Sequence, residues 1–82
     1  MVGRYNLKQA LALAPMDQCV LAHKSPSREW WRYGWAWGFL KRSILDVVAP
    51  VREKRYRDAL AIGYTVGERA RRELEATGVG GA

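Results

Sequence analysis

The two side chains best suited to covalent chemistry in this chain are its one cysteine and its one histidine. Cys19 and His23 stand four positions apart, so a helix would bring the thiol and the imidazole to one face, the minimum arrangement for an activated cysteine. The sequence offers no identifiable residue to orient the imidazole and no oxyanion site. As zinc ligands, the pair would need two more donors from elsewhere. We therefore expect no catalytic residues, no metal site and no cofactor, and the chain is predicted not to be an enzyme.

A denser group of residues suits binding. Four tryptophans fall within eight positions, in a segment that is also rich in arginine. Tryptophan and arginine contribute much of the binding energy at protein interfaces, and a guanidinium group stacks well on an indole ring. The segment supplies six candidate protein-binding residues: Arg28, Trp31, Arg32, Trp35, Phe39 and Arg42.

These candidates share one side of the segment only if it is a helix. At about 100° per residue, an opposite stripe gathers, which we predict to face the core: Trp30, Tyr33, Trp37, Leu40, Ile44, Val47 and Val48. Two interpretations of Trp31, Trp35 and Phe39 stay open: the first short helices cover them, or they form an exposed surface for a partner. A strand over residues 33–39 is a weaker alternative, because no second segment reads as a strand that would pair with it.

The chain is basic, with a formal net charge of +6. Its densest cluster is Arg52, Lys54, Arg55 and Arg57, and cations beside stacking tryptophans are how single-stranded nucleic acid is held. Acidic residues interrupt this cluster, which weakens the alternative. A helix-turn-helix over residues 7–24 fits poorly, because its turn would contain proline and no glycine. A membrane-surface helix is disfavoured, because the tryptophan segment is apolar on two sides.

Capping residues and prolines divide the chain into helices. Asn6 caps a short helix that ends or restarts at Pro15. Ser25, followed by Pro26, begins a long helix, which Pro50 ends near Val48. The region after Pro50 again shows helical spacing, and most of its charged residues form oppositely charged pairs four positions apart.

The predicted fold class is all-α: a small bundle of three to four helices, with two long antiparallel helices (about 26–48 and 51–76) and short N-terminal helices. Residues 1–76 form a single helical domain, and residues 77–82 form a flexible C-terminal tail. Each long helix carries two glycines four positions apart, which would let the backbones of two helices approach closely: Gly34 with Gly38, and Gly63 with Gly67.

The expected function is that of a small non-enzymatic regulator, adaptor or inhibitor that docks on a larger protein. Compact basic proteins of this size are common among phage and mobile-element accessory proteins. The alternative is a basic nucleic-acid-binding protein. A core of this size is often supported by a second copy, so a homodimer is expected. With a single cysteine, no export signal and no apolar run of roughly 20 residues, the chain is expected to be cytoplasmic and to have no transmembrane segment.

Overall fold

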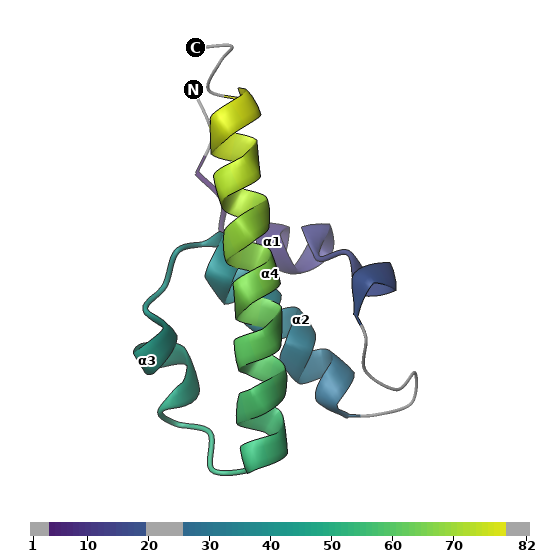
Figure 1. The fold of residues 1–82 in the computed structure, drawn as a ribbon, viewed down its shortest axis with the longest axis vertical. Coiled ribbons are helices and arrows are strands. Elements are labelled where there is room, and N and C mark those ends of the chain that lie inside the picture. The colour runs from purple at the N-terminus through teal and green to yellow at the C-terminus, as the bar shows by residue number, and fades with distance from the viewer. Residues whose placement is uncertain (1–3, 20–25, 79–82) are drawn as a thin grey trace.

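The computed structural model describes residues 4–19 and 26–78 of the chain, and within these ranges it is all-α (Figure 1). No strand occurs in these ranges, so the all-α prediction is confirmed and the alternative of a strand over residues 33–39 is wrong. The elements are α1 (Leu7–Leu13), a single 3₁₀ turn η1 (Met16–Gln18), α2 (Ser27–Phe39), α3 (Ile44–Val48) and α4 (Lys54–Gly78).

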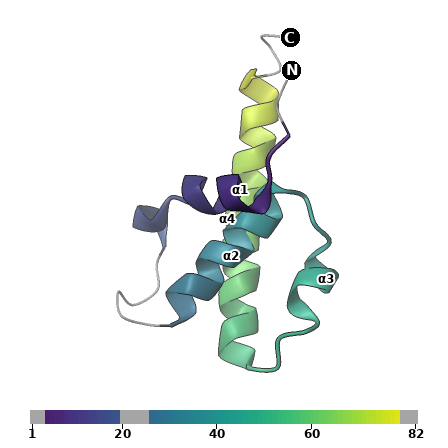
Figure 2. The ribbon, with the colours of Figure 1, turned by 180° about the vertical axis from the view of Figure 1, so that it is seen from behind.

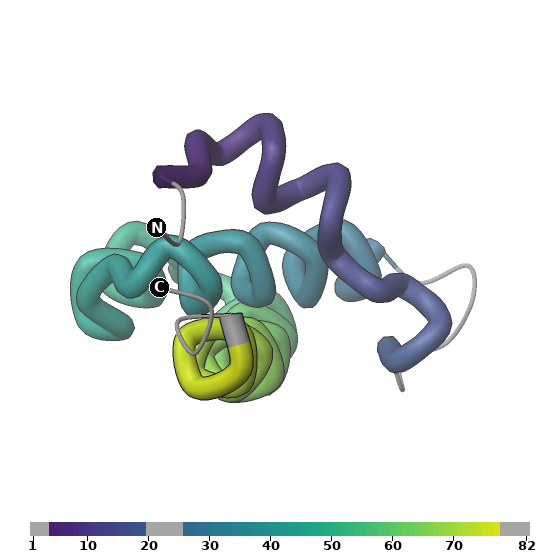
Figure 3. Tube along the Cα trace, turned by 90° about the horizontal axis from the view of Figure 1, so that it is seen from above, coloured from purple at the N-terminus to yellow at the C-terminus, as the bar shows by residue number. Residues whose placement is uncertain are grey.

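Helix α2 is the central element. From above, α1 lies on one side of α2 and α4 lies on the opposite side (Figure 3), and the view from behind shows α1 lying across α2 (Figure 2). Helix α2 therefore buries residues in two directions, against the N-terminal residues on one side and, through Gly34 and Gly38, against α4 on the other. Among the described residues, no helix is long and apolar enough to cross a membrane.

The contact between α2 and α4 is made through backbone at the four glycines predicted to form notches. A Cβ atom added at any of them would lie closer than 3.0 Å to a backbone carbonyl oxygen of the facing helix. The pairs are Gly34 with Leu60, Gly38 with Tyr64, Gly63 with Trp31, and Gly67 with Trp35. Each helix therefore places its glycine Cα–H groups against carbonyls of the other, a contact that recurs where helices pack closely. The predicted notches are confirmed.

The same contacts show that α2 and α4 run in the same direction. Gly34 meets Leu60 and Gly38 meets Tyr64, so the sequence number rises along both helices together. The prediction of an antiparallel pair is wrong. It assumed a short turn around Pro50, whereas residues 40–53, which include α3, lead the chain back to the start of α4 (Figure 1).

The long helix predicted over residues 26–48 is interrupted after Phe39. Lys41 adopts a positive φ of 62°, and the amides of Lys41 and Arg42 donate to the carbonyls of Gly38 and Trp37. This pattern is a Schellman motif, which usually has glycine or asparagine at the left-handed position. Because lysine occupies that position here, the sequence lacks the residue type that usually indicates such a helix end. The hydroxyl of Tyr64 on α4 donates to the Arg42 carbonyl and anchors the turn.

Several local predictions are confirmed. Asn6 caps α1 in a capping box in which Asn6 and Gln9 exchange hydrogen bonds of 2.8 and 2.9 Å. Helix α4 begins at Lys54 and reaches Gly78, close to the predicted residues 51–76. The predicted cap Ser25 lies outside the described residues. Of the tail predicted over residues 77–82, residues 77 and 78 belong to α4, and residues 79–82 lie outside the described residues. Three of the predicted pairs on α4 form: Lys54–Asp58 at 2.8 Å, Glu68–Arg72 at 3.6 Å and Arg71–Glu75 at 3.5 Å.

Candidate binding groove

The face of α2 that was predicted as an exposed docking surface is buried. Trp31, Trp35 and Phe39, the buried stripe, retain 1%, 3% and 4% of their accessible surface. The stripe packs against the N-terminal arm, which we define as residues 4–19, so the interpretation that the first short helices cover it is confirmed. The interpretation of an exposed stripe is wrong, because α1 and the segments flanking it pack on these rings.

A small residue, Ala10, allows the N-terminal arm to pack closely on the buried stripe. Ala10 is fully buried, so the backbone of α1 lies directly on the stripe. The ring of Tyr5 meets Phe39 edge-on at 5.1 Å between centroids, and Phe39 in turn stacks on Trp35 at 4.9 Å. Both geometries are favourable for aromatic pairs. The indole N–H of Trp35 is buried without a hydrogen-bond partner among the described residues.

Two of the three candidate arginines bind the same arm. Arg32 donates through Nε to the Leu11 carbonyl at 3.1 Å, and Arg28 donates to the Met16 carbonyl at 3.4 Å. The Leu11 carbonyl belongs to the last turn of α1, where carbonyls lack helical partners and cations interact well with the helix dipole. The structure therefore assigns Arg28 and Arg32 to an internal contact.

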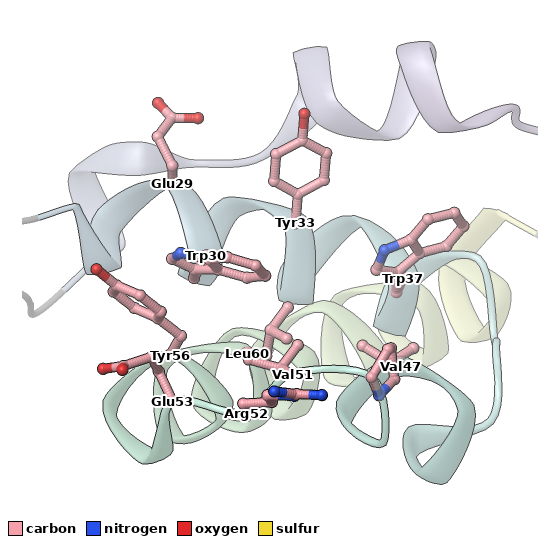
Figure 4. A pocket seen from close by; sticks show the side chains of 11 residues that line it. Glu29, Trp30, Tyr33, Trp37, Val47, Val51, Arg52, Glu53, Tyr56 and Leu60 are labelled. Carbon is pink, nitrogen blue, oxygen red and sulfur yellow. The ribbon is translucent and has the colours of Figure 1, made fainter.

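The opposite stripe of α2 lines an open groove of about 860 Å³ (Figure 4). This is the stripe that was predicted to face the core. Its rings are only partly covered, and Tyr33 keeps 41% of its surface exposed. The aromatic groove, as we call it, is lined by Glu29, Trp30, Tyr33, Trp37, Val47, Pro50, Val51, Arg52, Glu53, Tyr56 and Leu60.

Three segments build the aromatic groove. Helix α2 supplies one wall, α4 supplies Tyr56 and Leu60, and residues 47–53 line the side opposite α2 (Figure 4). At one end, Trp30 stacks on Tyr56 with 5.1 Å between centroids and an angle of 16° between rings, which joins the first turns of α2 and α4. The sequence placed the α2 residues of this wall on one stripe, but predicted that the stripe faces the core. It did not indicate that Tyr56 and Val51 would face them, because that depends on the parallel packing of the helices.

Guanidinium groups surround the aromatic groove. Arg52 lines it, Arg42 lies over the Trp37 ring at 5.1 Å, and Arg55 lies over the Tyr56 ring at 4.9 Å. The groove also contains two carboxylates. Glu53 is paired with Arg55 at 3.4 Å, and Glu29 is near Arg32 at 3.9 Å. Arg42, the third candidate arginine, therefore lies against a ring that lines the aromatic groove and not in the buried stripe.

The predicted nucleic-acid cluster is divided by its own ion pairs. Lys54 pairs with Asp58 at 2.8 Å and Arg55 pairs with Glu53. Arg52 lies at the aromatic groove, and Arg57 is exposed on α4. Of the four residues, Arg52 is the one that the structure places beside tryptophans of the groove.

The pKa values of two side chains outside the groove differ from their ordinary values. Burial, and then the nearby Glu68 carboxylate, raise the pKa of Tyr64, whose hydroxyl donates to the Arg42 carbonyl. A hydrogen bond from Lys41 lowers the pKa of Glu75, and burial opposes it more weakly. Both contacts fix the turn after α2, since Lys41 Nζ lies 2.6 Å from the Glu75 carboxylate on α4. Neither group lines the groove.

Cys19 is half-buried beside the core, and its proposed partner His23 lies outside the described residues, so their pairing stays untested. Within residues 4–19 and 26–78, no three His, Cys, Asp or Glu residues form a group that would hold a metal ion. The fold and the groove together define the class of the molecule as a small all-α protein with an open aromatic groove. Comparison with protein-family models, with curated proteins and with solved structures finds no match.

Proposed function

We propose that this chain is a small non-enzymatic protein-binding regulator, adaptor or inhibitor, and that it holds an apolar segment of a larger protein in the aromatic groove. One observation carries the proposal: the chain buries one aromatic stripe of α2 under its own N-terminal arm and leaves the other stripe in an open groove of about 860 Å³. Rings held in this way lose little further conformational entropy when a partner covers them.

The composition of the groove supports a protein partner. Tryptophan, tyrosine and arginine, the residue types most enriched among interface hot spots, occur together here in Trp30, Tyr33, Trp37 and Arg52. Each square ångström of apolar surface that a partner removes from water contributes about 25 cal/mol before the costs of association. The docking residues of this proposal replace the buried stripe that the sequence favoured.

Nucleic acid is the second candidate, because Arg52 and two tryptophans line the same groove. Base stacking requires free ring faces. Trp30 already stacks on Tyr56, and Arg42 covers a face of Trp37. The carboxylates of Glu29 and Glu53 also line the groove at its Trp30 end (Figure 4), where they would repel the phosphates of a strand that follows the whole groove. These features favour a protein segment over a nucleic-acid strand.

Site-specific photo-crosslinking in the native host tests the proposal. A photoreactive phenylalanine at Tyr33 should capture one protein at defined stoichiometry, and nuclease treatment should leave the product unchanged. The matched control is Ile62 on α4, which is 43% exposed and does not line the groove. Crosslinks to nucleic acid at Tyr33, or the same products from both positions, would contradict the proposal. The homodimer and the cytoplasmic location stay predictions.

A further inference from the structure

We infer that the occupant of the aromatic groove is an amphipathic α-helix of the partner, with carboxylates beside its apolar face. This inference rests on the proposed function and adds the conformation and the charge of the docking segment. Three properties of the groove carry it: the scarcity of polar groups in its lining, the surplus of guanidinium groups around it, and their uneven distribution along it.

The mostly apolar lining of the groove favours a helical conformation of the occupant. Apart from the hydroxyl and indole groups of its aromatic residues, the groove presents Glu29, Arg52 and Glu53 as polar side chains. An extended segment would bring backbone amides and carbonyls into this apolar surface, where unpaired groups are costly. An occupant in β conformation would also need a strand edge to pair with, and the described part of the chain contains no strand. A helix satisfies its own backbone and presents only side chains.

The guanidinium groups beside the groove favour an occupant that carries acidic residues. Arg42 and Arg52 form no ion pair with a carboxylate in the described ranges, whereas Glu53 is already neutralised by Arg55. Glu29 likewise lies 3.9 Å from Arg32, so the unpaired guanidinium groups of Arg42 and Arg52 are the charges that a partner carboxylate would complement. Complementary charges at the rim of an interface raise the association rate and fix the register.

The distribution of these charges also predicts an orientation. Glu29 and Glu53 lie at the end of the groove that holds Trp30 and Tyr56, and Trp37 lies at the other end (Figure 4). Because Arg42 stacks on Trp37, the cationic end is the Trp37 end. The carboxylates of the docked helix should therefore lie toward Trp37, with apolar anchors at positions i, i+3 or i+4, and i+7 along its buried face.

Selection from a library of 16-residue peptides displayed on phage, against the full chain, tests this inference. Selected peptides should combine helical spacing of large apolar residues with an excess of Asp and Glu. In calorimetric titrations of a selected peptide, Tyr33→Ser should weaken binding about tenfold or more, as expected for an interface anchor. The matched variant Ile62→Ser, equally exposed but outside the groove, should change affinity less than about twofold.

The charge component is tested separately. Arg42→Gln combined with Arg52→Gln should weaken the acidic peptide several-fold at low salt and leave a version with Gln in place of its acidic residues unaffected. Arg69→Gln, an exposed arginine of α4 that does not line the groove, is the matched control. A spin label at the acidic end of the peptide should broaden the Trp37 indole signal more than that of Trp30.

Each other outcome overturns the inference in a distinct way. Selected peptides that are proline-rich, extended or basic would show a groove-binding protein with a different occupant, and the proposed function would stand. Dimerisation of the chain that Tyr33→Ser abolishes would make a second copy the occupant. Failure to select any groove-dependent peptide, together with no protein crosslink at Tyr33, would remove both the inference and the proposed function.

Discussion

Four glycines fix how closely α2 and α4 approach, and single methyl groups test them. In a helix interior, glycine is about 1 kcal/mol less favourable than alanine. At Gly34, Gly38, Gly63 and Gly67 that disadvantage is offset by packing, since the space for a Cβ atom is taken by a backbone carbonyl of the facing helix. A carbonyl in a helix cannot rotate away as a side chain can, so the two helices would have to separate.

Gly38→Ala should therefore destabilise the protein although it raises helix propensity. Overpacking typically costs about 1–3 kcal/mol, and the fixed position of the Tyr64 carbonyl places this substitution toward the upper end. Urea unfolding followed by circular dichroism measures the change. Thr65→Ala, on the exposed side of α4, should stay within about 0.5 kcal/mol of wild type. A stabilised Gly38→Ala variant would contradict the close backbone contact.

Lys41 is the residue whose backbone is least suited to its side chain. A left-handed conformation costs a non-glycine residue about 1–2 kcal/mol, and Lys41 has a φ of 62°. Lys41→Gly should raise stability by about 0.5–1 kcal/mol when it is made in a Glu75→Gln background, after the larger chain entropy of glycine is included. In the wild-type background the gain should be smaller, because the ion pair with Glu75 is lost as well. Thermal unfolding of the wild type, the two single variants and the double variant separates the two effects.

At the scale of elements, the N-terminal arm depends on contacts with α2. Helix α1 has seven residues, too few to be stable alone, so its stability comes from the buried stripe and from Arg32. Arg32→Met keeps much of the aliphatic stem but removes the donor to the Leu11 carbonyl, and should destabilise the arm by about 1 kcal/mol.

Local measurements distinguish loosening of the arm from global unfolding. In Arg32→Met, the Ala10 amide should exchange faster with solvent and acrylamide should quench the tryptophan fluorescence more strongly, while amides in the middle of α4 keep their protection. Arg69→Met, an exposed change on α4, serves as control. Unchanged exchange at Ala10 would mean that packing on the stripe holds α1 without the arginine.

These elements also show what the sequence determines. The cap at Asn6, the helical character of residues 27–39 and 54–76, and the glycine notches follow from local spacing, and each was predicted. The direction of α4 relative to α2 and the choice of which stripe stays open were not predicted correctly. Neither follows from local spacing. The path of residues 40–53 sets the direction of α4, and the packing of the N-terminal arm covers Trp31 and Trp35. Both stripes of α2 are apolar and aromatic, so the sequence alone does not show which one the rest of the chain covers.

At the scale of the whole molecule, a small core and a high charge act against each other. A chain of this size buries a modest fraction of its surface on folding, and the formal net charge of +6 adds repulsion. The Lys41–Glu75 pair, at 2.6 Å, joins the turn after α2 to the C-terminal half of α4, and Arg71 contacts the same carboxylate while its guanidinium lies over the rings of Tyr5 and Phe39. One carboxylate thus connects three parts of the fold.

Acid should weaken this connection by protonating Glu75. The folded state lowers the pKa of Glu75, chiefly through the hydrogen bond from Lys41. A lowered pKa means that the contribution to stability is complete above the pKa of an unfolded glutamate, about 4.3, and disappears as the pH falls through the lower value of the folded state. The stability difference between wild type and Glu75→Gln, measured by urea unfolding from pH 7 to pH 3, should therefore shrink toward zero on acidification. Glu73→Gln, an exposed neighbour on α4, corrects for the change in net charge. If the Glu75→Gln difference persisted undiminished at pH 3, the carboxylate would not be stabilising the fold through its charge, and the two helices would be held together by the glycine contact and the aromatic packing alone.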